Sequence, residues 1–470
     1  MTPGRSDALV LFGITGDLAY KKIFPALQAM VRKGHLDMPV IGIARSNRDL
    51  TQFKARVKDS LQEHGSFDQG AFTKLASLLR FVNGDYNEAT TYTALRETLG
   101  NAASPLYYLA IPPSAFSTVA DHLASSDCIK NARIVVEKPF GRDLASAQAL
   151  NKILLGYFPE HAIFRIDHYL GKEPVQNLIY FRFANPIIEV GWNRDSIESV
   201  QITMAESFGV GGRGKFYEEA GAIRDVLQNH MLQVVACLAM ECPRSNADEA
   251  IRDERVRLLK SVRTLDPASI VRGQFRGYCK EPGVSSDSGV ETFASARFQI
   301  DNSRWSGVPF YVRVGKCLPV TVTEVFVHFK CPDRAILSDC SPRLANYYRL
   351  RISPEVVIAI GTRVKKAGDV LEGESIELLA HHKDKDEMDP YERLLGDAAN
   401  GDPSLFARQD GVEESWRVVD QVLGDKTQLV EYEIGSWGPC GLTETVAPDI
   451  GWHEPVSEPL EACSCPVERR

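Results

Sequence analysis

Nine consecutive residues, 165–173, gather side chains of four chemical types that could act together. They supply a carboxylate, an imidazole, a phenol and an ammonium, on Asp167, His168, Tyr169 and Lys172. Pro174 follows, and because proline is favoured at the start of a helix, we expect a helix to begin there. A helix N-terminus offers backbone N–H groups and a positive dipole end to an anion. The segment therefore indicates either a phosphate or carboxylate site or a solvated polar loop, and Asp167 could instead orient a base.

A second histidine lies in a segment with helical periodicity. Residues 217–238 are expected to form one long helix, on which His230 shares its face with Val226 and Val234. His230 should therefore point into the protein, either as a structural core histidine whose hydrogen bonds are satisfied or as a base. On an α-helix Asp225, five residues away, lies off this face. A carboxylate from another segment would then have to orient the imidazole, and Asp167 is the candidate.

The first apolar run, 8–13, ends in a glycine turn. Its residues, within Gly13-Ile-Thr-Gly-Asp-Leu-Ala19, include Gly13, Thr15, Gly16, Asp17 and Leu18. A helical pattern over 21–32 follows. Strand, glycine turn and helix together are typical of nucleotide phosphate binding, although the full G-x-G-x-x-G fingerprint is absent. The alternative is a glycine turn in some other α/β domain.

The strand expected at 39–44 is followed by Arg45. Domains that bind NAD usually carry an acid at this point, which binds the adenosine ribose hydroxyl. An arginine suits a 2′-phosphate instead, so the sequence favours NADP over NAD, and a surface arginine is the alternative.

Strands and helices alternate through the rest of the first half. Strands are expected at 80–86, 106–111, 133–138 and 162–166, and helices at 53–61, 72–79, 115–124 and 144–155. This alternation predicts an N-terminal Rossmann domain, a doubly wound and mainly parallel α/β sheet. Ligands bind beyond the carboxyl ends of such strands. Lys138 lies at one of these ends, and its bond to Pro139 could be cis.

The pattern changes in the second half. Segment 198–206 alternates like an antiparallel strand with one solvated face, and further strands are expected at 291–299, 310–314, 324–330, 347–352, 355–360 and 374–379. These segments predict a larger α+β domain with a mostly antiparallel sheet and helices. We therefore expect an NADP-binding domain (1–172), a larger second domain (173–454), to which the family resemblance described below assigns substrate binding and dimerisation, and a flexible tail (455–470).

Composition excludes several classes of protein. The chain has 470 residues and a net charge of −8, which disfavours broad nucleic-acid binding. No apolar run is long enough to cross a bilayer, and the first residues lack a signal-peptide apolar region. Ten scattered cysteines in so long a chain do not indicate a disulfide scaffold, so we expect a reduced, cytoplasmic protein. Cys463 and Cys465 could hold a metal only with distant partners, and no metal is expected.

Five motifs in order resemble the glucose-6-phosphate dehydrogenase family, over roughly residues 9–451. They are the glycine turn, Glu137-Lys-Pro-Phe-Gly141, the nine residues 165–173, Ile223-Arg-Asp-Val-Leu-Gln-Asn-His230, and Gly307-Val-Pro-Phe310 with Gly315-Lys316. The resemblance implies oxidation of glucose 6-phosphate at C1 to the 1,5-lactone with hydride transfer to NADP, the first step of the oxidative pentose phosphate pathway. A neutral histidine paired with a carboxylate can accept the hydroxyl proton as the hydride leaves.

The resemblance also implies a role for each motif residue. His230 matches the general base and Asp167 the carboxylate that holds its other nitrogen. The phosphate-binding residues match His168, Tyr169 and Lys172, and the carboxylates on sugar hydroxyls match Glu206 and Asp225. Lys138 matches a lysine between substrate and cofactor, and Lys316 a lysine on the substrate side. Arg45 matches the arginine at the 2′-phosphate, and Lys22 the last lysine of the glycine-turn motif.

Some positions depart from the family pattern. Thr321 stands where the family commonly has a basic residue, and Ser353 where many members have a glutamine that contacts substrate. Val322 and Trp437 stand at two positions that are basic in members with a second, structural NADP, so we predict none here. The family places its large antiparallel sheet at a dimer interface, which implies a homodimer or homotetramer.

Two other functions stay open. An oxidoreductase of the glucose–fructose type would share the Glu-Lys-Pro strand end but lacks the His-Tyr-x-Gly-Lys loop that this chain has. A non-catalytic copy that binds nucleotide or sugar phosphate would explain Thr321 and Ser353, whereas the intact Asp167 and His230 argue against it.

Overall fold

The apolar runs of the first half form a six-stranded parallel sheet, in the order β3-β2-β1-β4-β5-β6. The strands are β1 (Ala8–Phe12), β2 (Val40–Ala44), β3 (Leu79–Asn83), β4 (Pro105–Leu109), β5 (Arg133–Glu137) and β6 (Ile163–Ile166). Side chains alternate between the two faces, so Leu9 and Leu11 enter one hydrophobic cluster while Val10 and Phe12 enter the other. Both faces are therefore buried, and the predicted doubly wound sheet is confirmed.

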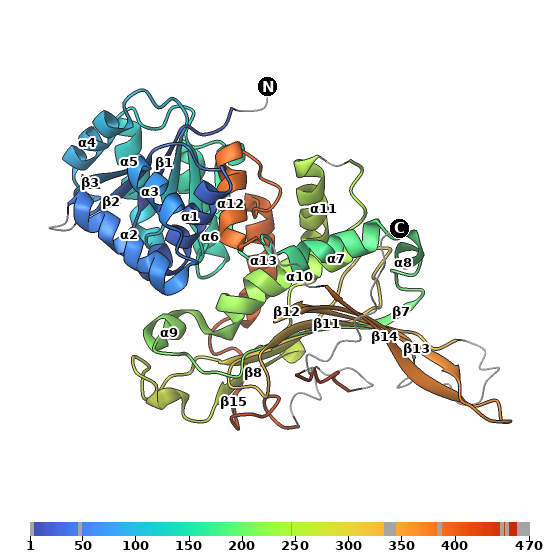
Figure 1. Cartoon of the computed structure of the whole chain (residues 1–470). Coiled ribbons are helices and arrows are strands. Elements are labelled where there is room, and N and C mark those ends of the chain that lie inside the picture. The colour runs from blue at the N-terminus through green and yellow to red at the C-terminus, as the bar shows by residue number, and fades with distance from the viewer. Residues whose placement is uncertain are drawn as a thin grey trace, which may run out of the picture. The chain divides into compact units, whose positions relative to one another are not determined.

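Helices cover both faces of this sheet (Figure 1). They are α1 (Phe24–Arg32), α2 (Leu50–His64), α3 (Gln69–Leu78), α4 (Ala89–Leu99), α5 (Phe116–Ser125), α6 (Leu144–Tyr157) and α12 (Pro390–Asn400). Helix α4 was not predicted from the sequence, and only Thr91, Tyr92, Leu95 and Leu99 of it are buried. Helix α12, from the far end of the chain, also packs Leu394 and Leu395 into the same cluster as α1, a contact that local sequence patterns do not indicate.

The computed structural model describes residues 4–45, 49–245, 247–332, 345–382, 388–441, 446 and 451–457. The chain forms two units. The first unit comprises 1–176, 240–257 and 387–416, and the second comprises 177–239, 258–386 and 417–470. The division at 172/173 and 454/455 stays a prediction, and Cys463 and Cys465 of the expected tail lie outside the described residues.

The second unit is built on a nine-stranded sheet in the order β14-β13-β12-β11-β7-β10-β9-β8-β15. The strands are β7 (Ile197–Ala205), β8 (Ile270–Phe275), β9 (Phe293–Phe298), β10 (Phe310–Gly315), β11 (Val322–Phe329), β12 (Tyr347–Ser353), β13 (Val356–Lys365), β14 (Gly373–His382) and β15 (Leu429–Tyr432). All neighbouring pairs are antiparallel except β7–β10 and β8–β15. The predicted, mostly antiparallel sheet is confirmed, and β8 and β15 are additional strands.

The expectation that β7 has one solvated face was wrong. β7 is the central strand, and Gln201 and Thr203 on its polar face are buried. Gln201 accepts a hydrogen bond from the backbone N–H of His453, and Thr203 accepts one from Arg313. The polar face is thus covered by residues 451–457, a contact that alternation along β7 could not indicate.

The remaining helices lie at α7 (Glu173–Phe183), α8 (Pro186–Val190), α9 (Gly214–Ala222), α10 (Leu232–Ala239), α11 (Asp248–Ser261) and α13 (Gln409–Val419). The helix expected at Pro174 is therefore α7, in whose first turn Pro174 lies. Within the described residues, no helix is long and apolar enough to cross a membrane.

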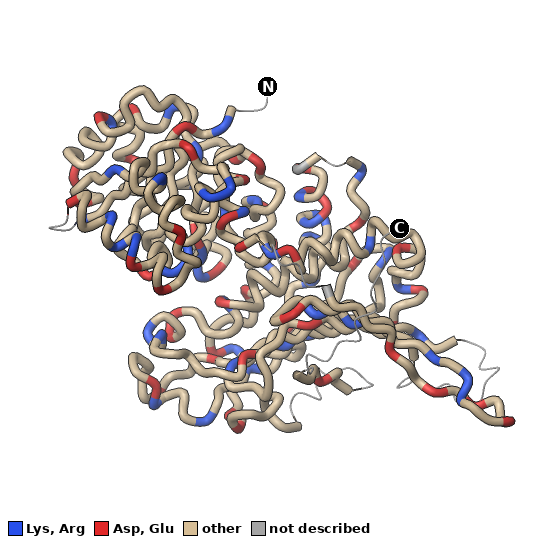
Figure 2. Tube along the Cα trace, viewed as in Figure 1, with Lys and Arg blue, Asp and Glu red and all other residues tan. Residues whose placement is uncertain are grey.

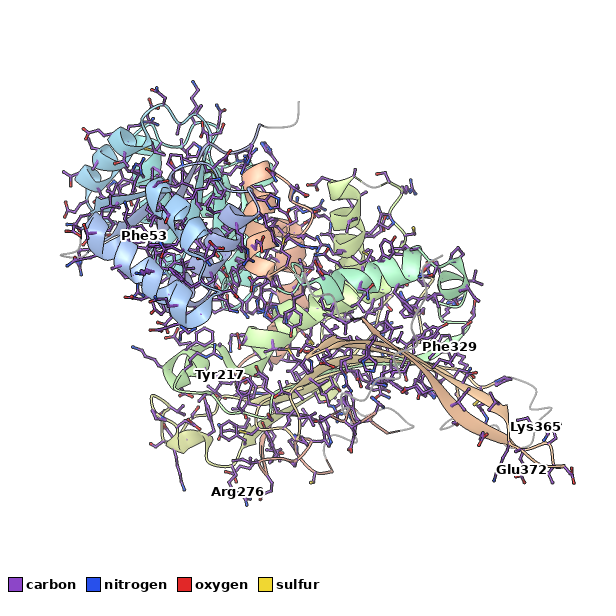
Figure 3. The ribbon with its side chains drawn as sticks, viewed as in Figure 1. Phe53, Tyr217, Arg276, Phe329, Lys365 and Glu372 are labelled. Atoms are coloured by element: carbon purple, nitrogen blue, oxygen red, sulfur yellow. The ribbon has the colours of Figure 1, made fainter. Side chains whose placement is uncertain are left out.

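Strands β13 and β14 form a long hairpin at the edge of the second sheet. Its ladder runs from Val356 opposite His382 to Lys365 opposite Gly373. Figure 3 shows Lys365 and Glu372 at the far end of the hairpin. Figure 2 shows basic and acidic residues interspersed over the described part of both units.

Candidate active site

The glycine turn after β1 requires glycine at its first position. Gly13 has φ +84°, and a Cβ on it would lie 2.1 Å from the carbonyl oxygen of Ala110. Gly16 then closes the turn, because its N–H donates to the Gly13 carbonyl over 3.0 Å. Thr15, Gly16 and Asp17 are left exposed at the tip. This geometry fits a loop that a dinucleotide pyrophosphate approaches closely.

The helix after the turn begins earlier than expected. A wide, π-type turn at Ala19–Ile23 precedes α1, and it carries Lys22 on its exposed side. Ile23 and Phe24 are buried, as the periodicity predicted. The residues of the turn and the first helical N–H groups therefore lie together at the carboxyl edge of the sheet, where an anion is favoured.

Two residues that the sequence analysis missed hold this turn in place. The Tyr86 hydroxyl accepts a hydrogen bond from the Gly13 N–H at 2.9 Å and donates one to the carbonyl of Ile43 at 3.1 Å. The Arg56 guanidinium donates to the carbonyl of Thr15 at 2.8 Å. Sequence spacing alone gave no signal for either, because each comes from an element that meets the turn only in the folded sheet.

Arg45, at the end of β2, has an acidic partner. Its Nη1 lies 2.8 Å from Oδ2 of Asp85, which follows the neighbouring strand β3, and the arginine side chain is 80% exposed. The backbone N–H of Asn87 and the Arg45 guanidinium lower the pKa of Asp85. Sequence analysis found no acid at the tip of β2 itself, yet the parallel sheet supplies one from the adjacent strand.

Lys138 and Asp167 are the first residues after two adjacent strands, β5 and β6, and they lie at the same register. Glu137 pairs with Ile166 in the ladder between β5 and β6, so the residue that follows each one emerges at the carboxyl edge. The Lys138–Pro139 bond is cis, as the sequence suggested. Glu137 itself accepts a hydrogen bond from the buried Tyr108 hydroxyl, and burial raises the pKa of Glu137 to about 7.

The loop 167–172 is folded on itself. The Asp167 carboxylate accepts a hydrogen bond from the Tyr169 N–H at 3.0 Å, and Asp167 is 3% exposed. The Lys172 ammonium lies 3.9 Å from the centroid of the Tyr169 ring, and the ring of His168 packs edge-on against that ring at 5.3 Å. The predicted phosphate residues therefore form one cluster in the first unit, beside the N-terminus of α7.

A second cluster surrounds Lys316 in the second unit. The Lys316 ammonium lies 2.5 Å from Oε2 of Glu206, and the side chain is only 2% exposed. It also lies 5.4 Å from the ring centroid of Phe208 and 5.1 Å from that of Tyr217. Tyr217, labelled in Figure 3 on α9, is a residue that the sequence analysis did not single out.

Carboxylates gather around Tyr217. Burial raises its pKa well above the usual range, and the neighbouring carboxylates Asp225, Glu291 and Glu206 raise it further. Glu206 and Asp225, predicted to bind sugar hydroxyls, thus both act electrostatically on Tyr217, whose ring lies beside Lys316. The backbone N–H of Ser207 donates a hydrogen bond to the hydroxyl of Thr321 at 2.9 Å, so Thr321 stabilises the loop that follows Glu206.

The expected continuous helix through His230 was wrong. Gly221 has φ +64° and ψ 176°, which breaks α9, and Ile223–Met231 then forms a wide π-type helix before α10. His230 is 2% exposed, as predicted. In a helix with hydrogen bonds five residues apart, residues i and i+5 lie on successive turns, so the geometric argument against Asp225 no longer holds. Asp167 as the partner of His230 stays a prediction, since the two residues belong to different units.

Comparison with known proteins gives the family. The model of the glucose-6-phosphate dehydrogenase NAD binding domain matches residues 10–177, and that of the glucose-6-phosphate dehydrogenase C-terminal domain matches residues 179–453. The chain belongs to the glucose-6-phosphate dehydrogenase family.

Relatives in this family match along almost the whole chain. Glucose-6-phosphate 1-dehydrogenase 1 of Mycobacterium tuberculosis (strain ATCC 25618 / H37Rv) is 40% identical over 468 residues, 96% of this chain and 97% of the relative. Glucose-6-phosphate 1-dehydrogenase of Saccharomyces cerevisiae (strain ATCC 204508 / S288c) is 37% identical over 473 residues, 94% and 93% of the two chains.

Solved structures of the family have the same fold. The crystal structure of glucose-6-phosphate 1-dehydrogenase from Mycobacterium avium matches with a TM-score of 0.91 and 42% identity, over 97% of this chain and 100% of the other. A structure of glucose-6-phosphate dehydrogenase in complex with its substrate glucose-6-phosphate matches with a TM-score of 0.89 and 34% identity over the same shares. The fold class and the family resemblance of the motifs are confirmed.

Proposed function

We propose that this chain oxidises glucose 6-phosphate at C1 to 6-phosphoglucono-1,5-lactone, with hydride transfer to NADP. The observation that carries the proposal is family membership over both domains together with intact motif residues in two clusters. NADP would supply the hydride acceptor. The loop Gly13–Leu18, Lys22 and Arg45 would hold it, and the exposed tip of that loop fits a dinucleotide.

The chain's own residues would bind the sugar and move one proton. His168, Tyr169 and Lys172 would hold the phosphate, and Glu206, Asp225 and Lys316 would hold the sugar, with Lys138 between sugar and cofactor. His230 would take the C1 hydroxyl proton, because a neutral imidazole is a suitable acceptor near pH 7. Asp167 would hold its other nitrogen. Fixing the C1–H bond against the nicotinamide would supply much of the rate enhancement. The mechanism as proposed uses no metal.

The direct test is absorbance at 340 nm with purified protein, glucose 6-phosphate and either NADP or NAD. Free glucose is the control for the phosphate. Reduction that requires the phosphate supports the dehydrogenase. Reduction with free glucose at equal efficiency would favour an oxidoreductase of the glucose–fructose type. Binding of glucose 6-phosphate without reduction of either cofactor would favour a non-catalytic copy.

The proposal includes no second, structural NADP. Trp437 is already engaged, since the Arg313 guanidinium lies 4.1 Å from its ring centroid and 4.5 Å from that of Trp452. Val322 is buried in the sheet. Both residues pack in one hydrophobic cluster of the second unit, and Arg313 also donates a hydrogen bond to the carbonyl of His453. Equilibrium dialysis should therefore recover one NADP per chain, and two would contradict this part of the proposal.

We also propose a homodimer, or a tetramer made of such dimers, through the second sheet. β14 is an edge strand with large exposed apolar side chains, including Leu378 at 55% and Leu379 at 47%. Long apolar edges are otherwise liable to aggregate, so pairing with a second copy would cover this one. Light scattering after gel filtration should give a multiple of the chain mass, and Leu378→Glu should shift it toward the monomer. A cytoplasmic location stays a prediction from cysteine usage.

A further inference from the structure

The start of the wide helix that carries His230 is held by one distant residue. The break at Gly221 interrupts the helical hydrogen bonding, so the buried N–H groups of Ala222 and Ile223 need acceptors from outside the helix. Glu291 supplies both. Its backbone carbonyl accepts from Ala222 at 2.9 Å, and its side-chain Oε1 accepts from Ile223 at 3.1 Å. Glu291 thus caps the segment Ile223–Met231 from 68 positions further along the chain.

The other oxygen of Glu291 is paired with a buried arginine. Arg272 Nη2 and Nε lie 3.2 and 3.3 Å from Oε2, and both side chains are less than 5% exposed. Arg272 is itself tied to the carbonyls of Gly289 and Thr427. A carboxylate at a helix N-terminus is also favoured by the helix dipole. The position of the carboxylate is therefore fixed from both sides.

Gly221 allows this contact. A Cβ at residue 221 would lie 2.5 Å from Glu291 Oε1 and 2.9 Å from its carboxyl carbon. Any side chain there would push the carboxylate away from the Ile223 N–H. The glycine therefore has two roles, since it adopts the positive φ that breaks the helix and leaves room for the carboxylate that caps the next segment.

The adjacent residue holds Lys316. The carbonyl of Thr292 accepts a hydrogen bond from the Lys316 N–H at 3.0 Å. The Tyr432 hydroxyl donates to the Lys316 carbonyl at 2.6 Å and lies 3.1 Å from the Thr292 hydroxyl. Two consecutive residues, Glu291 and Thr292, thus support the two segments that carry His230 and Lys316.

We infer that Glu291 is a positioning residue for the sugar-binding and proton-accepting groups of the second unit. Glu291 fixes the start of the wide helix Ile223–Met231, and hence the placement of Asp225 and His230. The next residue, Thr292, holds Lys316. This inference rests on the proposed function. Because misplacement of a reacting group by about 1 Å can cost about a hundredfold in rate, loss of the cap should lower turnover well before it unfolds the protein.

Two variants disturb the contact from opposite sides. Glu291→Gln offers one acceptor oxygen where the carboxylate offers two. Either the Ile223 N–H or the Arg272 guanidinium, both hydrogen-bond donors, would then face the amide NH2 group, which is also a donor. Gly221→Ala leaves Glu291 intact but displaces its carboxylate. The matched control is Gly424→Ala, because Gly424 also has a positive φ, +74°, and no atom lies within 4 Å of the position that a Cβ would take there.

The expected result is a tenfold to hundredfold fall in kcat with glucose 6-phosphate for both variants and an unchanged KM for NADP. Hydrogen exchange of the amides 222–231, followed by mass spectrometry, should become faster in both. The fall in kcat of the double variant should be smaller than the product of the two single falls, since both changes act through one contact. Gly424→Ala should change neither readout.

Faster exchange with kcat within twofold of the wild type would reduce Glu291 to a structural support and overturn the inference. So would unchanged exchange at 222–231 in both variants. A wild type that reduces neither cofactor would count against the proposed function instead. The exchange data would then still decide whether Glu291 holds the segment.

Discussion

Lys316 and Glu206 form a contact of 2.5 Å between ammonium and carboxylate, and the lysine is almost fully buried. A buried lysine with one carboxylate partner and two aromatic rings is held in a single orientation. We expect Lys316→Ala to lower kcat/KM for glucose 6-phosphate by about a hundredfold, or about 2.7 kcal/mol, with the KM for NADP unchanged. Lys330→Ala, which removes an exposed lysine of the same unit, is the control. Equal losses in the two variants would contradict a substrate role.

The Arg45–Asp85 pair predicts cofactor preference. Arg45→Ala should lower kcat/KM for NADP by about tenfold and leave that for NAD nearly unchanged, because only NADP carries the 2′-phosphate. Asp85→Asn should act in the opposite direction, since it releases Arg45 from its carboxylate partner. Steady-state rates at 340 nm with both cofactors provide the test. An equal change for NADP and NAD would show that Arg45 does not recognise the 2′-phosphate.

Because the segment that carries His230 is a wide helix, Asp225 becomes a candidate beside Asp167 for the carboxylate that orients the His230 imidazole. His230→Asn should lower kcat by several orders of magnitude with little change in substrate binding, as expected on losing a general base. If Asp167 orients the imidazole, Asp167→Asn should lower kcat and alter the pH profile, whereas Asp225→Asn should mainly raise the KM for the sugar. The reverse pattern would assign the orienting role to Asp225.

The loop 167–172 predicts a phosphate-dependent loss. Lys172→Ala should raise the KM for glucose 6-phosphate by about a hundredfold, because it removes a charged hydrogen-bond donor from the cluster. Any slow turnover of free glucose should be unaffected, since that sugar has no phosphate. A similar loss with both sugars would indicate that Lys172 supports the fold of the loop.

Glu137 predicts a pH dependence of stability. Burial raises its pKa from 4.5 to about 7, although the Tyr108 hydroxyl and the Lys138 ammonium favour the ionised form. Between these two pH values the folded protein binds more protons at Glu137 than the unfolded chain does. The free energy of unfolding should therefore fall as pH rises through this window, by at most about 1.4 kcal/mol per pH unit. Urea midpoints at pH 5, 6, 7 and 8 should show a smaller fall for Glu137→Gln, and equal slopes would contradict the assignment.

Local signals account for what could be predicted. Apolar runs, glycine turns and prolines act within a few residues, so the parallel strands and the start of α7 followed from the chain itself, whereas the sequence offered the cis form of Lys138–Pro139 only as one of two forms. The candidate residues followed from motif resemblance. One error arose where a distant segment overrides the local pattern. β7 alternates like a half-exposed strand, yet 451–457 covers its polar face.

The sequence by itself determined the family, most of the element types and the identity of the chemical groups, because these depend on residue type and short-range periodicity. Only the tertiary structure decided the partners of those groups. Asp85 reaches Arg45 from the neighbouring strand, and Glu291 caps the helix of His230 across the break at Gly221. Such contacts depend on how strands pair and where backbone N–H groups lack a local acceptor, which is settled when the chain is folded.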